Sequence, residues 1–124
     1  MKDFTDLVGC KYKLHGRDEN GFDCYGLVLE VEKRFNNFLP DFDYESYTNE
    51  YFNDKAVSVI KMGSALKVNS YCEGAILLFG KGLKDHIGVY IGDGWFIHCN
   101  KKGVHLEKVS LLKDKDVEIY IWQN

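Results

Sequence analysis

The sequence predicts an α+β domain in which helices come first and an antiparallel sheet follows. Two observations support this fold class. After Cys24, apolar residues recur at helical spacing, at Leu27, Val28, Val31 and Phe35. The second half of the chain instead contains short β-rich runs, separated by glycine-containing or charged turns with no helical pattern between them. We therefore expect the strands to follow one another as an antiparallel meander, with the helices packed on one side of a curled sheet.

Composition limits both the number of domains and the kinds of partner. A chain of 124 residues can form one hydrophobic core but not two, so we expect a single domain over residues 1–124. The net charge is −3, and the basic side chains are scattered along the chain. This pattern disfavours a nucleic-acid or anionic-membrane partner. Apolar runs are too short to span a bilayer, and the first residues lack the apolar stretch of a secretory signal peptide.

The first half predicts the helices. A short helix is expected over residues 3–8, and glycine-punctuated residues 9–22 are expected to form a loop. A longer helix should begin after Asp23, a good N-cap residue type, and run to about Asn36. A third helix is expected over residues 44–62, where the apolar residues are only loosely periodic.

The second half predicts five strands of five or six residues each. They cover residues 75–79, 87–91, 95–99, 104–109 and 117–122. Strands at such close spacing are typical of antiparallel sheets joined by tight turns.

The four cysteines lack the spacing of a zinc site, and we expect them to be separate reduced thiols. Cys10, Cys72 and Cys99 are then small, buried apolar residues. Cys24 differs because it lies where a helix begins. The unpaired N–H groups and the positive dipole end of a helix N-terminus favour a thiolate. A nucleophilic cysteine also needs a base, which is most often a histidine.

Two of the four histidines are candidates for that chemistry. His86 opens a predicted strand, and a strand start on a sheet rim is rigidly held yet open to solvent. His98 lies in the next strand among bulky apolar residues, where a satisfied core histidine is the alternative. His15 and His105 are expected to be solvent-exposed or structural.

The turn at Gly92-Asp93-Gly94 decides whether these two histidines meet. A three-residue loop pairs Gly88 with His98 and makes His86 and His98 diagonal neighbours on one face of the sheet. A two-residue Asp93-Gly94 turn sends them to opposite faces, unless a bulge restores the first register. The sequence permits both arrangements.

Taken together, these segments resemble the NlpC/P60 family of cysteine peptidases. The matching blocks are Gly21–Leu27 around the cysteine, Glu73–Phe79, His86–Gly92 and Phe96–Cys99, with Tyr12 about a dozen residues before the cysteine. The resemblance covers roughly residues 5–110 in order. It implies a papain-like NlpC/P60 fold whose curled antiparallel sheet has five or six strands.

The resemblance also implies an activity, the hydrolysis of peptidoglycan stem peptides at the bond following γ-linked D-glutamate. Cys24 would be the nucleophile and His86 the base, while His98 would orient His86 by accepting its ring N–H. The backbone N–H of Cys24 is the natural oxyanion donor. Tyr12 would help to shape the oxyanion hole, its alternative being a tyrosine packed on the sheet. Such a site needs no metal and no cofactor.

Asp23 and Tyr25 are the remaining candidates for substrate binding. In family members that bind the free amine of a wall peptide, an Asp and a Ser of this segment help to recognise it. Tyr25 replaces that Ser here, so the same specificity does not follow.

The Asp-Cys-Tyr-Gly-Leu-Val form, followed by Phe38–Phe42, most resembles the phage-tail-associated branch of the family. That branch implies phage tail proteins as partners, and a chain made in the cytoplasm that acts at the bacterial cell wall from the virion tail. Two alternatives to the peptidase stay open. They are an acyltransferase or amidase on the same scaffold and a catalytically inactive structural tail component.

Overall fold

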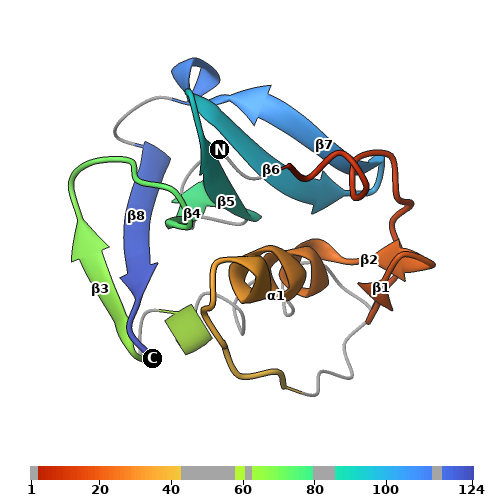
Figure 1. The fold of residues 1–124 in the computed structure, drawn as a ribbon, viewed down its shortest axis with the longest axis horizontal. Coiled ribbons are helices and arrows are strands. Elements are labelled where there is room, and N and C mark those ends of the chain that lie inside the picture. Colours follow the sequence, from red (N-terminus) through yellow and green to blue (C-terminus); the bar gives the residue numbers. More distant parts are fainter. Residues whose placement is uncertain (1–2, 43–57, 61–62, 80–85, 113–115) are drawn as a thin grey trace.

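The computed structural model describes residues 3–42, 58–60, 63–79, 86–112 and 116–124 (Figure 1). Its labelled elements are β1 (Arg17–Asp18), β2 (Gly21–Phe22), α1 (Cys24–Arg34), β3 (Ala65–Val68), β4 (Ile76–Phe79), β5 (His86–Gly92), β6 (Trp95–Asn100), β7 (Gly103–Lys108), η1 (Val109–Leu111) and β8 (Val117–Trp122). Helix α1 packs against a curled antiparallel sheet, mainly against β5 and β6. The predicted α+β, papain-like fold is confirmed.

Helix α1 begins where the sequence predicts, because Asp23 caps it. The Oδ1 atom of Asp23 accepts a hydrogen bond from the backbone N–H of Gly26 at 2.8 Å. Lys33 and Arg34 occupy the last turn, where positive charge is favourable next to the carbonyl end of the helix dipole. The buried face of α1 includes Leu27, Val28 and Val31.

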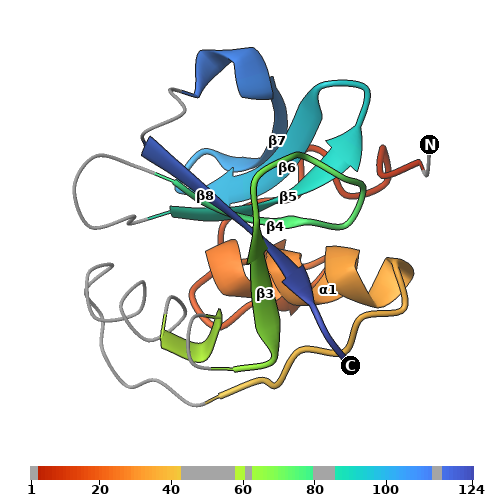
Figure 2. The same ribbon diagram turned by 90° about the vertical axis from the view of Figure 1, so that its left-hand side faces the viewer.

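Six of the described strands form one antiparallel sheet in the order β3-β8-β4-β5-β6-β7. The five predicted strands are confirmed to within one residue at each end. The simple meander is wrong at one point, because β8 lies between β3 and β4 rather than beside β7 (Figure 2). Its place there gives β4 a second hydrogen-bonded neighbour and leaves β3 and β7 as the two edges of the sheet.

The N-terminal region departs from the prediction. Residues 5–9 form turns instead of a helix over residues 3–8, with Leu7 N–H donating to Phe4 O and Cys10 N–H donating to Leu7 O. The predicted loop 9–22 contains the β1–β2 hairpin. The predicted helix over 44–62 lies outside the described residues except for 58–60, which are helical. In the described part of the chain, no helix has both the length and the apolar character needed to cross a bilayer.

The β5–β6 hairpin resolves the register that the sequence left open. Asp93 and Gly94 have φ angles of 53° and 84°, as the mirror-image two-residue hairpin turns require. The register then shifts between Tyr90 and Gly92, where the strand bulges. As a result, Gly88 pairs with His98. The turn has two residues, but the bulge restores the pairing of the three-residue loop.

The two faces of the sheet carry different cores. The helix-facing side is the face against α1, and its strand residues include Ile76, Leu78, Ile87, Val89, Ile97 and Cys99. The far side is the opposite face, and its buried strand residues include Leu77, Phe79, Phe96 and Ile119. Because successive strand residues alternate between faces, His86 and His98 belong to the far side.

Candidate active site

Cys24 is the first residue of α1 and packs in the core of the helix-facing side, with 8% of its surface exposed. Burial raises the pKa of its thiol well above the ordinary value, and the nearby Asp23 and Cys99 add to this rise. The backbone N–H groups of Tyr25 and Cys24 act in the opposite direction, as a helix N-terminus should. Burial outweighs the helix N-terminus here, so the structure favours the thiol over the predicted thiolate. A base must then remove the thiol proton before the sulfur attacks.

Asp23 is fully buried and engaged within the chain. Its Oδ2 accepts a hydrogen bond from the backbone N–H of His15 at 2.8 Å, and its Oδ1 accepts bonds from Gly26 N–H and from the guanidinium of Arg17, which lies 3.0 Å away. Arg17 also forms two hydrogen bonds of 3.0 Å with the carboxylate of Asp41. The positive charge beside Asp23 therefore comes from Arg17 of the same chain.

Tyr12 lies beside the thiol. It forms an isolated bridge with Phe22 and packs, partly buried, against the core of the helix-facing side. Burial raises the pKa of its phenol, as do the neighbouring Asp23 and Cys24. Cys99 completes this group and donates an Sγ–H bond to the carbonyl oxygen of Phe22 at 3.2 Å. None of Cys10, Cys24, Cys72 and Cys99 forms a disulfide in the described structure.

Tyr25 is completely buried, so it does not present a surface to a substrate. Its hydroxyl donates to the carbonyl oxygen of Pro40, and its ring lies 4.8 Å from that of Phe42 between centroids. The structure therefore gives Tyr25 a packing role, and its substrate-binding role stays a prediction. The bulky phenol fills the space between α1 and residues 38–42 and holds that segment in place.

The candidate base and orienting residue share the far side. His86 is the first residue of β5 and pairs with Phe79 of β4. The Phe79 ring stacks on His86, with centroids 5.7 Å apart, and meets His98 edge-on at 5.4 Å. The two histidines are thus diagonal neighbours, with Phe79 in contact with both.

His98 faces β7 more closely than it faces His86. Its ring centroid lies 4.2 Å from that of His105, and its Nε2 lies 3.5 Å from Glu107 Oε1. Burial and the neighbouring His105 together lower the pKa of His98 to about 4, against the opposing effect of Glu107. The imidazole is therefore neutral near pH 7.

The described structure brings the predicted residues together in two groups rather than one. Tyr12, Asp23 and Cys24 lie on the helix-facing side, whereas His86 and His98 project from the far side. Strand alternation thus points the two imidazoles away from the face against which the core around Cys24 packs.

Sequence reasoning missed three residues. Arg17 lay in a predicted loop without a partner in view, and its role depends on the unpredicted β1–β2 hairpin. His105 and Glu107 lie opposite and beside His98 because a tight turn at residues 101–102 pairs His98 with His105. The sequence contained two signals for this cluster. The turn at residues 101–102 predicts a hairpin, and strand alternation places residues 105 and 107 on one face.

Comparison with protein families decides the classification. The family model described as "NlpC/P60 family" matches residues 9–120, nearly the whole chain. The chain belongs to the NlpC/P60 family. Solved structures of this family share its fold. The crystal structure of an NlpC/P60 family protein from Bacillus cereus matches with a TM-score of 0.65 at 21% identity, covering 95% of this chain and 37% of that one.

Two curated relatives of this NlpC/P60 chain come from Escherichia coli K12. The first, named Murein DD-endopeptidase MepS/Murein LD-carboxypeptidase, is 28% identical over 81% of this chain and 47% of its own length. The second, Murein DD-endopeptidase MepH, is 30% identical over 92% of this chain and 40% of its own length.

A third relative, the Gamma-D-glutamyl-L-lysine dipeptidyl-peptidase of Bacillus subtilis 168, is 28% identical over 85% of this chain and 32% of its own length. The NlpC/P60 chain thus spans less than half the length of these relatives.

Proposed function

We propose that the chain is a cysteine endopeptidase that hydrolyses peptidoglycan stem peptides at the bond following γ-D-glutamate. The observation that carries the proposal is the position of Cys24 as the first residue of a capped helix, within a domain whose family match spans residues 9–120. Relatives named as murein endopeptidases and a γ-D-glutamyl-L-lysine peptidase support the substrate class.

In the proposed reaction, His86 takes the thiol proton of Cys24 as the sulfur attacks the peptide carbonyl carbon. The oxyanion that forms is held by the backbone N–H of Cys24, with the hydroxyl of Tyr12 nearby. His86 then returns the proton to the leaving amine, and water hydrolyses the thioester. His98 positions His86 by accepting a hydrogen bond from the ring N–H of His86.

This mechanism requires His86 to reach the thiol of Cys24. His86 is the first residue of β5 and is half-buried, so its side chain lies at the end of a strand where solvent reaches it. The buried, protonated thiol of Cys24 fits a mechanism in which deprotonation accompanies attack.

A second candidate is a domain without hydrolase activity. The projection of His86 and His98 from the face opposite the core around Cys24 favours it specifically, as does the raised thiol pKa. In that case the domain needs no rearrangement of these side chains to carry out its role.

We also propose membership in the phage-tail-associated branch, with tail proteins as partners, synthesis in the cytoplasm and action at the bacterial wall. The two sequence features that suggest this branch contact each other, since Tyr25 touches both Pro40 and Phe42. Asp41 adds an ion pair with Arg17, which in turn holds Asp23. The features therefore form one physical unit beside the nucleophile.

The deciding experiment incubates the purified chain with defined muropeptides and identifies the products by mass spectrometry, with Cys24→Ser as the matched control. We expect cleavage after γ-D-glutamate by the natural chain and no cleavage by the variant. Alkylation by iodoacetamide, located by peptide mapping, reports in parallel on the reactivity of Cys24. A chain that cleaves no stem peptide and whose Cys24 resists alkylation would establish the second candidate.

A further inference from the structure

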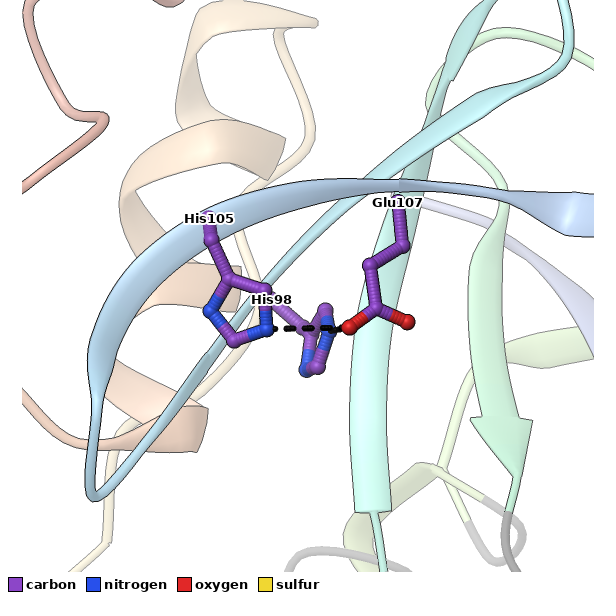
Figure 3. Close-up of side chains that lie close together, drawn as sticks. All are labelled: His98, His105 and Glu107. Carbon is purple, nitrogen blue, oxygen red and sulfur yellow. Dashed lines mark hydrogen bonds and ion pairs between the residues drawn. The ribbon is translucent and has the colours of Figure 1, made fainter. Parts of the chain in front are cut away.

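Three side chains with metal-binding atoms converge on the far side of the sheet. His98 projects from β6, and His105 and Glu107 project from β7 toward it (Figure 3). One ligand atom from each residue lies within 4.8 Å of the other two. The cluster combines two imidazoles and one carboxylate, a set that zinc commonly binds.

The distances within the cluster match a zinc coordination sphere. Ligand atoms about 2.0–2.1 Å from a tetrahedral zinc ion lie roughly 3.3 Å from one another. In the structure, Glu107 Oε1 lies 3.1 Å from His105 Nε2 and 3.5 Å from His98 Nε2. These two distances to Glu107 Oε1 are therefore already close to the spacing that zinc needs, and the ligand atoms of the two histidines lie within 4.8 Å of each other.

The hydrogen bonding of His105 indicates a cation in the same place. Its Nδ1 lies 3.0 Å from the carbonyl oxygen of Gly103, and its Nε2 faces Glu107 Oε1. A neutral imidazole has one N–H. When Nδ1 donates that N–H to the carbonyl, the lone pair of Nε2 points at a carboxylate oxygen. Either a second proton or a metal ion resolves this contact, and a backbone carbonyl bound to Nδ1 is the usual support for a metal-ligating histidine.

The state of His98 favours the metal over the proton. His98 is 5% exposed, and neither of its ring nitrogens has a hydrogen-bond partner among the described residues. A buried polar group without a partner costs free energy, which a second proton on His105 does not recover. A metal ion would give His98 a partner and would also separate His105 from Glu107.

We propose that His98, His105 and Glu107 bind one zinc ion per chain, with water in the remaining position. The side chains of His105 and Glu107 are 30% and 37% exposed, so solvent reaches the site. Two imidazole nitrogens select zinc over magnesium or calcium, which prefer all-oxygen sites. The site shares His98 with the proposed hydrolysis. It is tested by binding alone, so its failure can be told apart from a failure of the proposed hydrolysis.

The test is a zinc titration by calorimetry on tag-free, chelator-treated chain, together with cobalt(II) absorption spectra. We expect one zinc ion per chain, visible absorption bands typical of tetrahedral cobalt with nitrogen and oxygen ligands, and no binding of magnesium. His105→Ala and Glu107→Gln should each weaken zinc binding by at least about 10–100-fold. Removing a residue that only hydrogen-bonds a metal ligand already costs that much affinity, and removing the ligand itself should cost no less.

His15→Asn is the matched control, since it removes a histidine outside the cluster at a position with φ of 64°, which asparagine tolerates. It should bind zinc like the natural chain. Glu107→Gln alters a partly exposed side chain, so it keeps the test valid if His105→Ala fails to fold. Zinc should raise the melting temperature of the natural chain and of His15→Asn, but not of Glu107→Gln. Absence of micromolar binding, undiminished binding by Glu107→Gln, or a cobalt–thiolate charge-transfer band would overturn the proposal.

Discussion

The two sides of the central sheet differ in how their polar groups are satisfied. On the helix-facing side, both carboxylate oxygens of the buried Asp23 accept hydrogen bonds, and Arg17 neutralises the charge. On the far side, His98 is almost as deeply buried, yet its ring nitrogens have no hydrogen-bond partner within the described ranges. Buried polar groups are normally paired. The difference indicates that Asp23 supports structure, whereas His98 is available for a ligand or a reacting partner.

The same comparison concerns catalysis. The thiol of Cys24 belongs to one side, and the imidazoles of His86 and His98 belong to the other. His86 is the first residue of its strand, whereas His98 lies inside a strand that is paired on both sides. The two histidines should therefore respond differently to substitution.

The largest expected effect is on hydrolysis. Cys24→Ala and His86→Ala should each lower kcat/KM on a muropeptide by more than about 10⁴-fold, because each removes a group that takes part in bond breaking. His98→Ala should leave measurable hydrolysis, since His98 only positions His86. Rates like those of the natural chain in either of the first two variants would refute the assignment, and complete loss in His98→Ala would refute the division of roles.

Removing Arg17 should most destabilise the helix-facing side. Arg17→Ala leaves the buried carboxylate of Asp23 without its cation, and breaking such a pair costs about 3–5 kcal/mol. Urea unfolding at pH 7 measures this loss. Asp41→Asn is the matched control, because it removes the exposed partner of Arg17 and should cost less than about 1 kcal/mol. Equal losses of unfolding free energy in the two variants would show that the buried Arg17–Asp23 pair stabilises the fold no more than the exposed Arg17–Asp41 pair.

Glu32 makes the stability of the helix-facing side depend on pH. Burial raises the pKa of its carboxyl to about 8, and the hydrogen bond donated by Asn37 Nδ2 only partly opposes this. Between about pH 4.5 and 8 the folded chain therefore holds a proton that the unfolded chain has lost, so stability should fall as pH rises through this window.

Glu32→Gln should remove that dependence and raise the free energy of unfolding at pH 8 by roughly 2–4 kcal/mol relative to the natural chain. Denaturant titrations of both chains at pH 5 and pH 8 measure the difference. An unchanged gap between the two chains across this range would show that Glu32 is already ionised in the folded state.

A smaller effect is expected from filling space on the far side. A Cβ atom at Gly88 would lie 2.9 Å from the carbonyl oxygen of Ile97 and 3.1 Å from His98 Cβ, so the β5–β6 pairing must shift. Gly88→Ala should lower the free energy of unfolding by roughly 1–3 kcal/mol. It should also weaken zinc binding, because His98 moves. Unchanged stability in thermal unfolding would show that the strands yield without strain.

Much of the fold was predictable because its signals are local. The start of α1 at Cys24 follows from the capping chemistry of Asp23, and the predicted strands follow from β-rich runs between turn residues. The short strands β1 and β2 carried no such signal, since two residues cannot show a period. The helix over residues 3–8 failed because its N–H groups bond three residues back, as in turns.

The candidate site was predictable only in its residues. The motifs identified Tyr12, Cys24, His86 and His98, but their mutual positions depend on strand alternation and on a bulge near Ile91. The contact of His98 with Glu107 required the pairing of β6 with β7, and Tyr25 could be recognised as a packing residue only once residues 38–42 lay against it.

By itself, the sequence determined the fold class, the capped helix, the order of the strands along the chain and the resemblance that the family match confirms. The tertiary structure alone decided that β8 lies between β3 and β4, that Arg17 neutralises Asp23, and that the thiol at Cys24 and the histidines occupy opposite sides of the sheet. Capping and turn formation involve neighbours in the chain and can be read from it. Strand order, register and burial depend on contacts between distant residues, which set the pKa of Cys24 and bring His98, His105 and Glu107 together.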